Sequence, residues 1–267
     1  MTIAVGHNIY EITVDKGNVS GSGFLYSDDE LNSALQGPVA EVLFDDVGKT
    51  ELEKLLTGSA DTDFNIDFLK EILEVTSPPE NWRIGEALAE VYLTHHNECF
   101  FPWPDGRDER KSGSSLPGAD LVGLKKVGDD YCFAFGEVKT SSDTNCPPSL
   151  MYGREGLKQQ LEDLKDSIKI KNDLVVYLMH RAVNAVWKDQ FINAYTRFEQ
   201  SITNVHIFGF LVRDVKPNEK DLGTRVVKLA ENAYTDMVIQ LFAMYLPENS
   251  ISTLSEKVVS SRSGDNE

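Results

Sequence analysis

The stretch "YCFAFGEVKTSS", residues 131–142, joins an apolar run to two opposite charges at its end. The run predicts a β-strand, in which successive side chains point to opposite faces. Glu137 and Lys139, separated by one valine, then lie side by side on the same face. They form either a solvated ion pair, which contributes little to stability, or one half of a metal site.

The preceding residues predict the strand that pairs with this one. The runs "ADLVGLKKV" (119–127) and "YCFAFGEVK" (131–139) are separated by "GDD", which indicates a hairpin with its turn near 127–130. Antiparallel pairing then brings Asp120 opposite Glu137, within one residue of register. Two carboxylates suit Mg²⁺, which keeps several of its waters. Lys139 would orient or deprotonate an attacking water, or stabilise charge on a phosphate.

The segment "WRIGEALAEVYLTHH" (82–96) offers a third carboxylate. Its apolar residues follow helical spacing, and Glu86 and Glu90 lie four residues apart on one helix face. Either side chain would reach a metal at the strand ends. Glu86, beside Gly85 near the start of the helix, is the preferred one.

The pattern of Glu86 on a helix, Asp120 on a strand and Glu137 with Lys139 on the next strand resembles the PD-(D/E)xK nuclease superfamily. Ala119 stands where that superfamily usually has proline, a change that removes no ligand. The segments "RIGEALAEVYL", "PGADLVG" and "FGEVKTS" are also similar to the HamA family of nuclease subunits from Hachiman anti-phage defence systems. This similarity covers roughly residues 80–245, and the N-terminal region only loosely.

The resemblance implies a restriction-endonuclease-like fold and a metal-dependent DNA nuclease. It implies that Asp120, Glu137 and Glu86 hold Mg²⁺ or Mn²⁺ and that Lys139 assists the attacking water. It also implies a superfamily 2 helicase partner, HamB-like, which uses the ATP and restrains the nuclease until aberrant DNA is met.

Three further residues follow the motif in a segment predicted to be helical. Gln159 and Gln160 match glutamines that contact DNA or the metal-bound water in several related nucleases, although a solvated helix face explains them equally well. Arg154 would bind a phosphate or pair with a neighbouring acidic residue within the helix.

The order of predicted elements from residue 82 onward is α, β, β, β, α, β, α, β, α, an α/β fold with a mixed sheet flanked by helices. In it, 173–180 is a short buried strand that completes a βαβ crossover, and 224–246 is one long helix. A smaller acidic α+β region is expected over 1–78, the nuclease-like domain over 79–250 and a flexible polar tail over 251–267.

The net charge of −17 is concentrated at the N-terminus, since residues 1–80 hold 16 acidic and 4 basic side chains. The remainder is nearly balanced and leaves room for a local basic groove. No apolar run is long enough to span a membrane, no signal peptide is visible, and three scattered cysteines suit the cytoplasm. Two alternatives stay open: a catalytically silent scaffold of the same fold that docks a helicase, and a restriction or repair nuclease of the same superfamily.

Overall fold

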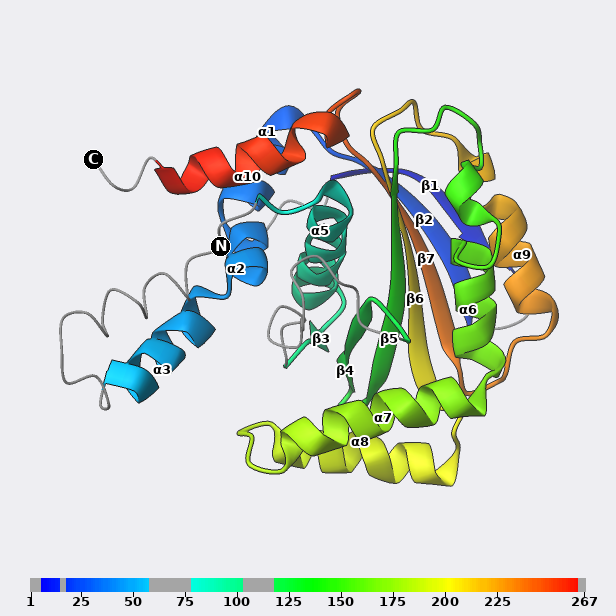
Figure 1. Ribbon diagram of the computed structural model, residues 1–267. Coiled ribbons are helices and arrows are strands. Elements are labelled where there is room, and N and C mark those ends of the chain that lie inside the picture. Colours follow the sequence, from blue (N-terminus) through cyan, green and yellow to red (C-terminus); the bar gives the residue numbers. More distant parts are fainter. Residues whose placement is uncertain (1–5, 15–17, 58–77, 103–117, 264–267) are drawn as a thin grey trace.

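One seven-stranded mixed sheet organises the chain (Figure 1). The computed structural model describes residues 6–14, 18–57, 78–102 and 118–263. The strands lie in the spatial order β1-β2-β7-β6-β5-β4-β3. Their bounds are β1 His7–Thr13, β2 Val19–Leu25, β3 Cys99–Phe100, β4 Leu121–Val127, β5 Asp130–Ser141, β6 Val205–Arg213 and β7 Val238–Tyr245.

The four central strands β2, β7, β6 and β5 are parallel, while β1, β4 and β3 pair antiparallel at the two sides. The predicted hairpin is confirmed, because β4 and β5 pair from Val127 opposite Asp130 to Leu121 opposite Gly136. Asp120 directly precedes β4 and therefore lies at the end of this ladder.

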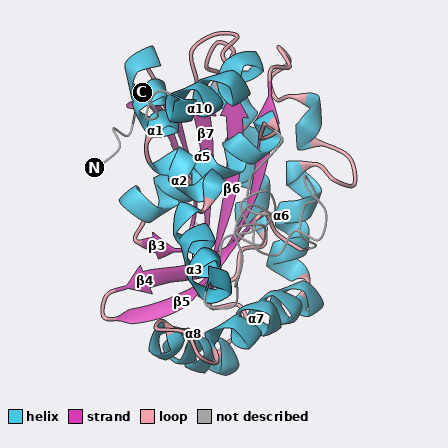
Figure 2. Cartoon of the chain, turned by 60° about the vertical axis from the view of Figure 1, so that its left-hand side comes forward, coloured by secondary structure: helices cyan, strands magenta, loops and turns pink. Residues whose placement is uncertain are grey.

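Helices cover both faces of the sheet (Figures 1 and 2). The alternation of side chains along β5 explains this, since Phe133 and Phe135 pack into one core and Ala134 and Val138 into the other. The first core is closed by α6 (Leu157–Asp166), α7 (Ile168–Ala182), α8 (Lys188–Gln200) and α9 (Gly223–Glu231). The second is closed by α1 (Asp28–Gln36), α2 (Pro38–Phe44), α5 (Asn81–His96) and α10 (Leu254–Ser263). The helix α3 (Asp46–Thr57) follows α2.

The N-terminal region contributes to the same sheet as the rest of the chain. β2 pairs in parallel with β7 along its whole length, from Val19 opposite Ile239 to Leu25 opposite Tyr245. The expected boundary near residue 78 therefore does not separate two sheets. The sequence predicts a short helix within 28–44, capped by Ser27 or Asp28. This helix is confirmed as α1, and Ser27 caps it by exchanging hydrogen bonds with Glu30. Apolar spacing also predicts a helix over 65–75, which lies outside the described residues.

Three expectations about the second half of the chain are wrong. Residues 173–180 lie in α7 and not in a strand, because Leu174, Val175, Leu178 and Ala182 are buried at helical spacing. The crossover from β5 therefore returns through α6, α7 and α8 to β6. The predicted helix 224–246 is instead α9 followed by β7, with a break at residues 232–237.

The segment from residue 251 to 263 is ordered helix and not a flexible tail. A short 3₁₀ turn, Ile251–Thr253, leads into α10, whose Leu254 and Val258 are completely buried against the second core. Spacing of four residues places these two side chains on one face of the helix. No helix within the described ranges is both long and apolar enough to cross a membrane.

Candidate metal and phosphodiester site

Asp120, Glu137 and Lys139 meet at the end of the β4–β5 hairpin. The register that pairs Leu121 with Gly136 sets Asp120 opposite Glu137, as the hairpin prediction required. Glu137 and Lys139 lie on the same face of β5 as Phe133 and Phe135, which is the face that α6 covers. The Lys139 Nζ atom lies 3.5 Å from Glu137 Oε2 and 3.8 Å from Asp120 Oδ2.

The Asp120 carboxylate is also held by the backbone of β5. Its Oδ2 atom accepts a hydrogen bond of 2.8 Å from the N–H of Val138. This bond fixes the position of the carboxylate beside Glu137, although the two groups repel each other when both are ionised.

The Glu137 side chain is almost completely buried, with 2 % of its surface exposed. Burial raises its pKa, the negative charge of Asp120 raises it further, and Lys139 opposes both, so that the pKa reaches about 9. Its buried Oε2 atom has the Lys139 ammonium group 3.5 Å away, without a hydrogen bond of good geometry from the described residues. A bound cation would give this buried oxygen a closer partner.

The structure brings together Asp120 and Glu137, while Glu86, the third predicted ligand, lies on α5. Across the described ranges, no group of three or more His, Cys, Asp or Glu side chains is arranged to hold a metal. The physical reason lies in the position of α5, which packs on the other face of β5. A Cβ atom built on Gly85 would clash with Thr140 Oγ1, so α5 and β5 lie close together at this point. Thr140 and Lys139 point to opposite faces.

The glutamines predicted after the motif lie on α6, above the face that Glu137 and Lys139 share. Gln159 Nε2 donates a hydrogen bond of 2.9 Å to Asp163 Oδ1, which favours a structural role within the helix. Gln160 Oε1 is buried and accepts no hydrogen bond from any described residue. Arg154 is exposed in the turn that precedes α6, where no contact with the three site residues is seen.

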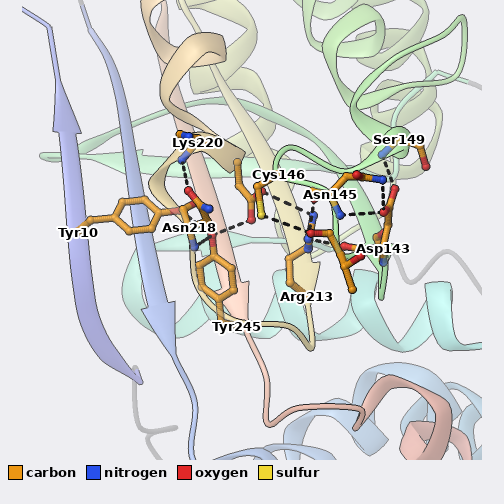
Figure 3. Close-up of polar contacts among 12 residues, drawn as sticks. Tyr10, Asp143, Asn145, Cys146, Ser149, Arg213, Asn218, Lys220 and Tyr245 are labelled. Carbon is orange, nitrogen blue, oxygen red and sulfur yellow. Dashed lines mark hydrogen bonds and ion pairs between the residues drawn. The ribbon is translucent and has the colours of Figure 1, made fainter.

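A buried arginine at the end of β6 was not predicted from the sequence. Arg213 is fully buried, and its Nη1 atom lies 3.7 Å from Asp221 Oδ1. Its Nη2 atom donates to the carbonyl oxygens of Asp143, at 2.6 Å, and Asn145, at 3.1 Å (Figure 3). Arg213 therefore fixes the loop that leaves β5 directly after Lys139. The only sequence signal was a charged pair, Arg213 and Asp214, closing the apolar run of β6.

The same network continues to the other side of the sheet. Tyr245 donates a hydrogen bond of 2.8 Å to Asp221 Oδ2, and its hydroxyl lies 3.0 Å from that of Tyr10 on β1 (Figure 3). Burial raises the pKa of Asp221, while Tyr245 and Arg213 oppose the shift. The loop after β5, the ends of β6 and β7 and the middle of β1 are thus connected around one buried ion pair.

Comparison with known proteins gives no assignment for this arrangement. No protein-family model matches the chain, and no curated protein matches it.

Proposed function

We propose that the chain is a metal-dependent DNA nuclease that hydrolyses phosphodiester bonds. The proposal rests on one observation, the convergence of Asp120, Glu137 and Lys139 at the end of a β-hairpin. The mixed sheet, with this site at the end of a strand beside the parallel strands, suits a restriction-endonuclease-like fold. The resemblance to HamA-type subunits further supports a role as the effector of a helicase–nuclease anti-phage complex.

Asp120 and Glu137 would hold the divalent cation, Mg²⁺ or Mn²⁺. The fit is supported by the buried Oε2 atom of Glu137, whose nearest cation is the Lys139 ammonium at 3.5 Å, and by the two carboxylates, whose oxygen atoms are the kind of ligand that Mg²⁺ prefers. When bound, the cation lowers the pKa of a coordinated water and polarises a phosphoryl oxygen. Further ligands would be waters, since Mg²⁺ commonly takes only one or two protein carboxylates.

Lys139 supplies the positive charge at this site. Its ammonium group stands between the two carboxylates and is partly exposed, so it would contact a phosphate that approaches the strand end. In that position it orients the attacking water and offsets the charge that develops on the phosphate. The Val138 N–H keeps Asp120 in place during the reaction.

A second candidate function is a catalytically silent scaffold that docks a helicase. It is favoured by one observation: no third acidic or histidine ligand joins Asp120 and Glu137 among the residues that the structure describes. In this case Lys139 would neutralise the two carboxylates as part of the fold. The two functions differ in what happens to DNA when the site is altered.

The test is a cleavage assay on plasmid and linear DNA with Mg²⁺, Mn²⁺ or EDTA. The chain is assayed alone and with a HamB-like superfamily 2 helicase, because the proposed partner would control access to DNA. Glu137→Gln and Lys139→Met should each reduce metal-dependent cleavage by at least about a hundredfold, the lower range for loss of one essential catalytic group.

The matched control is Asp129→Asn, an exposed carboxylate in the turn at the other end of the same hairpin. It should cleave like the wild type. Intact DNA under every condition, with and without the helicase, would support the scaffold. Equal cleavage by wild type, Glu137→Gln and Lys139→Met would mean that the active site lies elsewhere.

A further inference from the structure

A groove of about 400 Å³ lies between α6 and α9 on the sheet face that Glu137 and Lys139 share. Figure 1 shows the two helices side by side over this face. The groove is lined by the segments that follow β5 and β6, including Tyr152 and Lys220, and by Lys158 of α6 and Arg225 of α9. It therefore opens at the carboxyl ends of the parallel strands, the edge at which ligands bind in open α/β sheets.

The charges in the groove leave two lysines uncompensated. Arg225 Nη1 lies 2.7 Å from Glu162 Oε1, and Lys228 Nζ lies 2.7 Å from Glu231 Oε1. The third carboxylate of the groove, Asp221, faces Arg213. Lys158 and Lys220 are exposed, and no carboxylate within the described part of the chain forms an ion pair with either. In a chain with a net charge of −17, this local positive charge favours an anionic ligand.

An aromatic ring accompanies these lysines. Tyr152 lines the groove and leaves 57 % of its surface exposed. Exposed aromatic rings next to lysines are the combination with which proteins hold single-stranded nucleic acid, because bases stack on the ring while cations contact phosphates.

The groove lies on one flank of α6, and the site formed by Asp120, Glu137 and Lys139 lies on the other. Leu157, Leu161 and Leu164 face the sheet, and Lys158 and Glu162 then point toward α9. Gln160 lies on the opposite flank of α6, which packs on β5 and β6. Both flanks begin at the same edge of the sheet, because α6 starts where the loop from β5 ends.

We propose that this groove binds the phosphate backbone of a nucleic-acid strand, with Lys158 and Lys220 contacting phosphates and Tyr152 stacking on a base. The inference rests on the proposed nuclease function, since it assigns part of the substrate to the flank of α6 opposite the site of cleavage. A free phosphate or mononucleotide shares the phosphate chemistry, and the experiment separates these sources.

The first measurement is the affinity of the full chain for a fluorescent single-stranded oligonucleotide, by anisotropy, in EDTA and over a series of low salt concentrations. The double variant Lys158→Gln/Lys220→Gln should bind more weakly. In a plot of log affinity against log salt concentration, the magnitude of the slope should decrease by about 1.4 for this variant. Each lysine–phosphate contact on a single strand contributes about 0.7 to that slope. The control is Lys169→Gln/Lys188→Gln, two exposed lysines of α7 and α8 at the other end of the sheet (Figure 1), which should leave the slope unchanged.

The second measurement uses Tyr152. Tyr152→Ser should weaken oligonucleotide binding at least about fivefold without changing the salt slope, because stacking releases no counterions. Tyr152→Phe should restore the affinity. A tyrosine with only a structural role would not produce a loss of affinity at an unchanged salt slope that phenylalanine restores.

The inference is overturned if wild type fails to bind the oligonucleotide at low salt, or if the two lysine double variants have the same slope. It is also overturned if inorganic phosphate or a mononucleotide binds the groove as tightly as the oligonucleotide does, since the groove would then hold a free anion. The experiments distinguish a failure of the proposed nuclease function from a failure of the proposed groove. If no DNA is cleaved while the groove variants still lose affinity, the groove binds nucleic acid and the catalytic proposal alone fails.

Discussion

Asp120 on one strand is bound to the backbone of the next, through a hydrogen bond of 2.8 Å from the Val138 N–H to its Oδ2 atom. The bond holds a carboxylate next to Glu137, whose own carboxyl is buried. The hairpin therefore keeps the two acidic groups together although their negative charges repel each other when both are ionised, and a cation would offset that repulsion.

The first prediction concerns the effect of Asp120 on its neighbour. Asp120→Asn retains an oxygen that accepts from Val138 but removes the negative charge. The pKa of Glu137 should then fall by about 1 unit or more from about 9. Carboxyl-carbon NMR across the pH range measures the shift in the metal-free protein. Asp129→Asn should leave the pKa of Glu137 unchanged, and an unchanged value in Asp120→Asn would show that the two carboxyls do not interact.

The second prediction is the pH dependence of stability. The unfolded chain loses the Glu137 proton near pH 4.5, whereas the folded protein keeps it up to about pH 9. Between these values the folded state binds more protons, so stability falls as the pH rises, at most about 1.4 kcal/mol per pH unit from this one group. Glu137→Gln should lack this contribution and gain stability relative to wild type from pH 5 to pH 9. Urea unfolding in EDTA tests it, and parallel curves for the two proteins would contradict it.

The third prediction concerns the close contact of α5 with β5. A Cβ atom at Gly85 would clash with Thr140 Oγ1, a buried hydroxyl oxygen that makes no hydrogen bond with the described residues. Gly85→Ala should therefore reduce the free energy of unfolding by about 1–3 kcal/mol, as overpacking does, even though alanine favours helix. Thr140→Ala should be mild, and Gly85→Ala in that background should recover most of the loss. Equal effects of Gly85→Ala in both backgrounds would rule out the contact as the cause.

The fourth prediction concerns the buried Arg213. Arg213→Met should lower the free energy of unfolding by about 3–5 kcal/mol, because it leaves the Asp221 carboxylate buried without its partner. Arg213→Lys should recover little, since a single ammonium group cannot replace a guanidinium that contacts one carboxylate and two carbonyls. Arg213→Met/Asp221→Asn should be more stable than Arg213→Met alone. Urea unfolding of the three variants measures these differences, and a loss below about 1 kcal/mol in Arg213→Met would contradict the assigned role.

The sequence was sufficient to predict the hairpin and the three residues at its end. Local signals define this region: a turn, two apolar runs of matched length and side chains that alternate between faces. The partnership of Asp120 with Glu137 follows from counting residues on either side of the turn. The Mg²⁺ assignment and the nuclease activity remain predictions.

Features that depend on distant parts of the chain were missed. The apolar run at 173–180 is compatible with a buried strand or a buried helix, and only packing against the sheet decides for the helix. The strands β2 and β7 pair although they lie at opposite ends of the sequence, so the N-terminal region could not be assigned to the sheet in advance. The contacts of Arg213 with the β5 loop and Asp221 depend on the same long-range arrangement.

The central claim is that Asp120 and Glu137 together hold a divalent cation. The most direct test is to titrate Mn²⁺ into the purified full chain and to follow free Mn²⁺ by electron paramagnetic resonance. Wild type should bind Mn²⁺ more tightly as the pH rises from 6 to 9, because binding displaces the Glu137 proton. Glu137→Gln and Asp120→Asn should each lose this binding, while Asp129→Asn should retain it. Binding that is the same in all four proteins, or absent from the wild type at every pH, would contradict a metal site at this hairpin.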